Sequence, residues 1–126
     1  MGQQQLLLII LSIIIIGIAI AVAINLFRGN AIDRKREILI NESHNLGSIA
    51  MAYFKKPRMM GGGGKNFTGW IIPSNMRATV NGSYVAQVFG DSVVITGTGT
   101  EVVTENDSIK IQTIITGNRI YSTVIN

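Results

Sequence analysis

Few residues of this chain have side chains that could carry out catalysis. It contains one histidine and no cysteine. His44 lies near Glu42 in a segment of helical pattern, but no second imidazole or thiolate accompanies it, and a zinc site requires three or four ligands. The order and spacing of residues also match no Ser-His-Asp triad, paired-carboxylate cleft or dinucleotide-binding fingerprint. We therefore predict no catalytic residue, no metal site and no cofactor, and a protein that is not an enzyme.

Acidic residues gather near predicted turns in the C-terminal part, at Asp91, Glu101, Glu105 and Asp107. Carboxylates bind calcium, but a dedicated calcium loop places its oxygen ligands at alternating positions, and none of these segments does so. The favoured interpretation is that these acids keep the ends of strands soluble.

A glycine run, Gly61 to Gly64, is followed by Lys65 and resembles a phosphate-binding loop at first sight. A P-loop requires a strand before it, and a Gly-Lys-Ser/Thr sequence that opens a helix after it. Here Asn66 follows the lysine, and the preceding segment has the pattern of a helix. The composition instead predicts a flexible Gly-rich connector over residues 57–75.

The formal net charge is +4, and nine of the eleven basic residues lie between Arg28 and Arg77, with only three acids among them. A nucleic-acid-binding module would show a basic face interleaved with aromatic residues on a recognisable fold, which is not seen, so we predict no nucleic-acid partner. Basic residues directly after an apolar segment more often meet lipid headgroups or the acids of a neighbouring subunit.

The segment from Leu6 to Phe27 has 22 residues and no charged side chain. As a helix with a rise of about 1.5 Å per residue it is long enough to cross a bilayer core of about 30 Å. A secretory signal ends in a small-residue cleavage site, whereas the Ala-x-Ala triplets of this chain lie inside the apolar run. Residues 1–27 are therefore expected to remain on the protein as a hydrophobic membrane or filament-core helix.

Residues 28–56 are predicted to continue this helix in amphipathic form, with a weak point at Arg28-Gly29-Asn30. Apolar residues recur every seven positions. They are Ile32, Leu39, Leu46 and Tyr53, with Ile49 between the last two. Lys55-Lys56-Pro57 ends the helix, because proline disfavours helical geometry in the residue before it. We expect one helix from Gln3 to Phe54.

The pattern changes to a period of two within residues 76–126, which predicts an antiparallel β domain. Four strands are expected, at Tyr84–Phe89, Val93–Thr100, Ile109–Ile115 and Ile120–Ile125. Their separators are Gly90-Asp91, Glu105-Asn106-Asp107 and Gly117-Asn118, all typical of turns. A short extended piece, either Trp70–Ile72 or Met76–Val80, is expected to pair at an edge. The predicted fold class is α+β, a long N-terminal helix followed by a small antiparallel sheet of about four strands.

Four Asn-x-Ser/Thr triplets occur, at Asn41, Asn66, Asn81 and Asn106. In a secreted protein each would be a possible acceptor of an N-linked glycan, and whether any is used depends on the organism.

This arrangement resembles the type IV pilin and pseudopilin superfamily, in which a half-hydrophobic, half-amphipathic N-terminal helix leads into a small antiparallel sheet. Prepilins carry a short leader that ends in glycine and is cut just before the apolar helix, and Gly2-Gln3 is similar to that junction. The family's acidic residue at the fifth mature position is absent, since counting from Gln3 places Leu7 there.

The resemblance implies a structural subunit that waits in the inner or cytoplasmic membrane and is then assembled into an extracellular filament at the cell surface. The implied partners are identical subunits in a helical homopolymer, the membrane before assembly, a prepilin peptidase and the pilus assembly machinery. The expected processing site, where the leader is cut, is formed by Gly2 and Gln3. The residues expected to assemble the chain are Leu8, Leu11, Ile14, Gly17, Ile18, Ala21 and Ile24.

The alternative interpretation is a single-pass membrane-anchored protein whose β domain binds a partner or serves a secretion machine as a pseudopilin. The basic residues after the span would by the positive-inside rule place Lys35 in the cytoplasm, whereas pilins place that side outside. The sequence therefore leaves both interpretations open.

Overall fold

A computed structural model describes residues 2–104 and 106–126 of the chain. It consists of a long helix, α1 (Gly2–Lys55), a short 3-10 helix, η1 (Arg58–Met60), and four strands. The strands are β1 (Gly82–Val88), β2 (Ser92–Thr104), β3 (Asp107–Thr116) and β4 (Ile120–Val124). Met1 and Glu105, which fall in the predicted leader and in a predicted turn, lie outside the described residues. The predicted α+β fold class is confirmed.

Residue contacts divide the chain into two units, one up to Asp33 and one from Arg34 to Asn126. The described residues of the first unit, 2–33, are all helical, and Arg28-Gly29-Asn30 does not interrupt α1. This agrees with its composition, because a segment this apolar can satisfy its backbone groups in lipid only by forming a helix.

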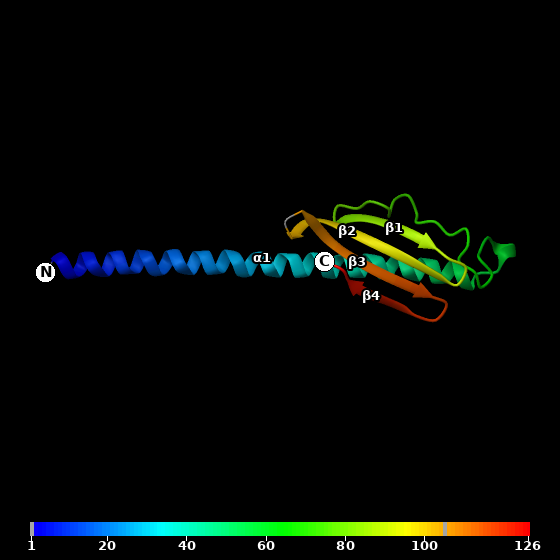
Figure 1. Cartoon of the computed structure of the whole chain (residues 1–126), viewed down its shortest axis with the longest axis horizontal. Coiled ribbons are helices and arrows are strands. Elements are labelled where there is room, and N and C mark those ends of the chain that lie inside the picture. The colour runs from blue at the N-terminus through cyan, green and yellow to red at the C-terminus, as the bar shows by residue number, and fades with distance from the viewer. Residues whose placement is uncertain (1, 105) are drawn as a thin grey trace. The chain divides into compact units, whose positions relative to one another are not determined.

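The second unit contains one antiparallel sheet with strand order β1-β2-β3-β4, so each strand pairs with its neighbour along the chain (Figure 1). The central β2–β3 pair continues past the expected strand end at Thr100, with a register shift between Thr98 and Val102. Side chains on β3 alternate between buried and partly exposed positions, as expected for a sheet with one covered face.

The last part of α1, from Arg34 onward, covers that face. Its buried residues are Leu39, Ser43, Leu46, Gly47 and Ala50. They face the inward side chains of the two central strands, which are Val93, Ile95, Ile109, Ile111, Thr113 and Ile115. Of the predicted stripe, Leu39 and Leu46 are buried, but Ile49 is 38% exposed, so its predicted place in the stripe is wrong. Three of the buried helix residues, Ser43, Gly47 and Ala50, are small, because the helix and the sheet approach each other closely there.

The close approach is clearest at Gly97 in β2, which pairs with Tyr84 in β1. A Cβ atom at this position would lie 2.9 Å from the Tyr84 ring and 3.5 Å from Ser43 Oγ. Any larger residue would therefore push the tyrosine ring or the helix away from the sheet.

The glycine run caps the C-terminus of α1. The backbone N–H groups of Gly63, Gly64 and Lys65 donate hydrogen bonds to the carbonyls of Tyr53, Lys56 and Phe54, at 2.8, 2.9 and 2.7 Å. Two of these carbonyls belong to the last turn of α1 and the third to Lys56 directly after it, and none has a partner within the helix itself. The segment that composition predicts as a flexible connector thus forms this cap, and beyond it Phe67 stacks on Phe54, with ring centroids 4.6 Å apart.

Replacing Gly63 with Ala should destabilise the second unit, because its Cβ would lie 1.7 Å from the Asn66 carbonyl oxygen. We expect a loss of about 1–3 kcal/mol in the free energy of unfolding. Urea unfolding of the full chain in detergent, followed by the fluorescence of the buried Trp70, measures this loss. A Gly63→Ala variant as stable as the parent would show that the glycine run does not hold this cap.

The segment between this cap and β1 closes one side of the core. Phe67, Trp70 and Ile72 are buried, and the Phe67 N–H donates to the Gly90 carbonyl at 3.1 Å. Of the two alternatives predicted for an extra edge piece, Trp70–Ile72 forms no strand, and Met76–Val80 contributes a single bridge between Ala78 and Ser83. The edge of β1 is therefore only briefly paired.

Candidate assembly surface

The apolar part of α1 exposes large hydrophobic side chains on all sides. The sixteen Leu, Ile, Val and Phe side chains from Leu6 to Phe27 are each between 52% and 73% exposed. The helix is long and apolar enough to cross a membrane. An amphipathic helix has one apolar stripe, whereas a helix apolar all round requires an apolar environment on every side.

The residues predicted to assemble the chain all lie in this exposed part of α1. Leu8, Leu11, Ile14, Ile18 and Ile24 are 53–63% exposed, and Gly17 and Ala21 are also exposed. At about 100° per residue, the i, i+3 series from Leu8 to Gly17 turns around the helix and does not form one straight face. The predicted assembly residues therefore share one helix but not one face of it. Neighbours such as Ile13 and Ile16 are exposed to the same degree.

Two polar side chains lie within this surface, Ser12 and Asn25, and Ser12 is satisfied locally. Its hydroxyl donates to the Leu8 carbonyl at 2.7 Å, one helical turn earlier. This hydrogen bond reduces the cost of placing the hydroxyl in an apolar environment.

The predicted processing residues lie at the start of α1. Gly2 is the first residue of the helix, and both Gly2 and Gln3 are exposed. A Cβ atom at Gly2 would contact nothing within 4 Å among residues 2–104 and 106–126, so packing against these residues does not require glycine there.

A second cluster, centred on Glu42 in the other unit, was not predicted from the sequence. The Glu42 carboxylate accepts hydrogen bonds from Asn81 Nδ2 at 2.8 Å, from Thr79 Oγ1 at 3.1 Å and from the Tyr84 hydroxyl. These donors lie in the segment before β1 and in β1 itself, 37 to 42 residues away along the chain. The cluster therefore ties α1 to the start of the edge strand.

These contacts change the acidity of both groups. Burial alone would raise the pKa of the Glu42 carboxyl, but the hydrogen bonds from Tyr84, Asn81 and Thr79 together outweigh it and hold this pKa below its usual value. The pKa of Tyr84 is raised by burial, by its hydrogen bond to Glu42 and by the negative charge there. A carboxylate held ionised and a phenol held neutral suit a structural tie better than proton transfer.

Acid should therefore weaken the second unit through Glu42. A carboxyl whose pKa is lower in the folded state stabilises the fold above the unfolded-state pKa, about 4.3, and this contribution is lost as the pH falls through the folded-state pKa. Glu42→Gln should lower stability at pH 7 by about 0.5–1 kcal/mol, since the site is partly open to solvent, and should flatten the acid dependence. Urea unfolding at pH 7 and pH 3 measures both.

The control for this substitution is Glu37→Gln, which alters an exposed glutamate of the same helix. It should leave stability at pH 7 unchanged. An acid dependence of Glu42→Gln as steep as that of the parent would contradict the assignment.

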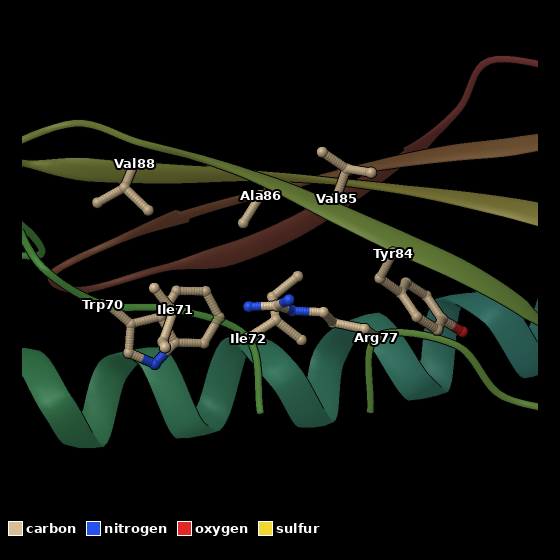
Figure 2. Close-up of a pocket in the computed structure, with 8 residues that line it drawn as sticks. All are labelled: Trp70, Ile71, Ile72, Arg77, Tyr84, Val85, Ala86 and Val88. Atoms are coloured by element: carbon tan, nitrogen blue, oxygen red, sulfur yellow. The ribbon is translucent and has the colours of Figure 1, made fainter. Parts of the chain in front are cut away.

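A groove of about 270 Å³ lies beside β1 (Figure 2). It is lined by Trp70, Ile71, Ile72, Arg77, Tyr84, Val85, Ala86 and Val88. Figure 2 shows the Arg77 side chain extended between the segment that carries Trp70 and the strand that carries Ala86. The lining of the groove is thus mainly apolar, with one cation, Arg77, and one titratable hydroxyl, that of Tyr84.

The remaining candidate residues are the possible metal ligands and the asparagines of the glycosylation triplets. Among residues 2–104 and 106–126, no group of three or more His, Asp or Glu side chains could hold a metal ion. Of the glycosylation triplets, Asn41 and Asn106 are exposed and Asn66 is half-buried, whereas the Asn81 amide is engaged by Glu42. A glycan on Asn81 would therefore break the Glu42 cluster.

The most extensive exposed apolar surface among the described residues is thus the apolar part of α1. Comparison of the chain with protein-family models, with curated proteins and with solved structures gives no match.

Proposed function

We propose that this chain is a structural subunit of an extracellular type IV pilus-like filament, and that α1 holds it in the membrane before assembly. One observation carries the proposal. The apolar part of α1 is exposed on all sides, while the later part of the same helix is covered by the sheet. The later half of α1 thus packs in the folded β domain, whereas the apolar half, residues 6–27, requires an apolar environment outside this chain.

Two environments satisfy such a helix, lipid and other apolar helices. Full burial of one Leu or Ile side chain contributes about 1.5–3 kcal/mol, so sixteen exposed side chains strongly oppose transfer into water. The helix can leave the membrane only if copies of itself replace the lipid. A contact repeated head to tail between identical subunits generates an open helical filament when its rotation does not close.

Small residues favour close packing between copies. Gly17 and Ala21 lie one turn apart and would let neighbouring backbones approach, as small residues do in membrane helix pairs. Leu8, Leu11, Ile14, Ile18 and Ile24 would supply the large side chains around them. In this proposal the partners are identical subunits, a prepilin peptidase and the pilus assembly machinery, and no nucleic acid is bound.

The proposal extends to processing at the N-terminus. We expect cleavage between Gly2 and Gln3, which would leave the Gln3 amine beside the amides of Gln4 and Gln5. These amides would supply acceptors for the ammonium in place of the absent acid, and cyclisation of the N-terminal glutamine would remove the charge. Intact-mass spectrometry of assembled protein decides this point, because retention of Met1 and Gly2 would contradict cleavage.

Isolation of surface filaments tests the proposal as a whole. Filaments sheared from native cells are expected to contain this chain as their main protein band. Recovery of the chain from the membrane fraction alone would instead support the anchored binding or secretion-accessory protein, for which α1 serves only as an anchor.

A further inference from the structure

The turn that follows α1 presents two methionines to solvent. Met59 is 100% exposed and Met60 is 66% exposed, both within η1. Burying an apolar side chain is favourable, so two adjacent exposed methionines indicate a surface that gains from contact with an apolar partner.

Basic residues flank these methionines along the chain. Lys55, Lys56, Arg58 and Lys65 are all exposed, and the sequence has no acid between Ser43 and Gly90. We call Met59, Met60 and these four cations the distal tip. The distal tip carries four cations and no acid, so the chemistry it matches is anionic.

The distal tip is held in place by the cap described above. The Met60 N–H donates to the Pro57 carbonyl at 3.0 Å, and the Gly61 N–H donates to the Arg58 carbonyl at 3.0 Å. Arg58 Nε also donates to the Gly63 carbonyl at 3.5 Å. The methionines are therefore presented by a folded turn, so a contact there would require little ordering of the chain.

We propose that the distal tip is a docking surface for an anionic lipid membrane. Cations near such a surface are attracted to its headgroups, and apolar side chains between them enter the boundary between headgroups and acyl chains. This combination distinguishes lipid from a soluble polyanion, since a polyanion offers charge but nothing apolar for the methionines. Nucleic acid would further require aromatic side chains for stacking, and none is exposed in this turn. The proposal is independent of whether the chain assembles into filaments.

Vesicle sedimentation tests this inference with the full chain held by α1 in a phosphatidylcholine nanodisc. Sucrose-loaded vesicles of phosphatidylcholine alone, or with one quarter phosphatidylglycerol, are added and pelleted, and empty nanodiscs give the background. We expect sedimentation with the anionic vesicles only. A basic residue near an anionic surface contributes about fivefold to binding, so Lys55→Gln/Lys56→Gln should weaken binding about 25-fold.

The methionines provide the decisive variant. Met59→Ser/Met60→Ser should weaken binding to anionic vesicles about tenfold while leaving the fold unchanged, because neither side chain is buried. The matched controls are Val80→Ser, at another highly exposed apolar residue, and Lys110→Gln/Arg119→Gln, which removes two cations elsewhere; both should bind as the parent does. The proposal is overturned by absence of binding, by equal binding to neutral vesicles, or by unchanged binding of the methionine variant, which would indicate a site for polyanions in general.

Discussion

Replacing Ile14 with Asp is expected to abolish filament assembly and to leave the fold of residues 34–126 intact. Ile14 lies in the middle of the exposed apolar part of α1 and is 53% exposed in the single chain. A carboxylate there costs about 2.5–3.5 kcal/mol on the scale for membrane insertion, and an apolar bundle of helices is an equally poor solvent for it. At about 1.4 kcal/mol per tenfold, each association step should weaken by a hundredfold or so.

The matched control is Ile14→Leu, which keeps the volume and the apolar character of the side chain. Electron microscopy of sheared material should show filaments for the control and none for Ile14→Asp. Trp70 fluorescence confirms that the second unit is folded in both. Normal filaments formed by Ile14→Asp would mean that this part of α1 does not lie in the filament core.

The second large effect is expected at Leu46, where the helix meets the sheet. Leu46 is 1% exposed and lies on the face that also contains Leu39 and Ala50. Leu46→Ala should lower the free energy of unfolding by about 2–5 kcal/mol, because it removes apolar contacts and leaves a cavity. Urea unfolding of the full chain in detergent, followed through Trp70, measures the loss.

Ile49→Ala is the control on the same helix. Both substitutions shorten a large aliphatic side chain, but Ile49 is 38% exposed, so its loss should cost about 1 kcal/mol or less. Equal losses for the two variants would contradict the orientation of α1 on the sheet.

The fold was predictable because the apolar residues of each helix and strand recur with a clear period. An unbroken apolar run and a seven-residue spacing from Ile32 predict one long helix. Alternation of β-branched residues with turn residues between them predicts the four strands. The order of the strands follows as well, since short turns join neighbours in an antiparallel meander.

Features that depend on close contact between segments distant in the sequence were not predictable from periodicity. Ile49 matched the apolar stripe, yet the contact surface consists partly of Ser43 and Gly47, which no hydrophobic pattern selects. Gly61 to Gly64 has the composition of a linker, and only the positions of the free helical carbonyls make it a cap.

The Glu42 cluster was missed because its partners are distant in sequence. Thr79, Asn81 and Tyr84 become neighbours of Glu42 only when β1 lies along the helix. One available signal was an acid bordering the buried stripe of α1, since a carboxylate in that place requires hydrogen-bond donors from a packed element.

A filament core built from α1 requires contact between the apolar helices of different copies, and photocrosslinking detects such contact. A benzophenone amino acid at position 14 of the otherwise unchanged chain reacts with C–H groups that lie next to it when illuminated. If α1 lies in the core of a filament, illuminated surface material should give a ladder of bands at multiples of the subunit mass. If α1 is only an anchor, illumination should give the single-chain band and lipid adducts alone, and this result would contradict a filament core built from α1.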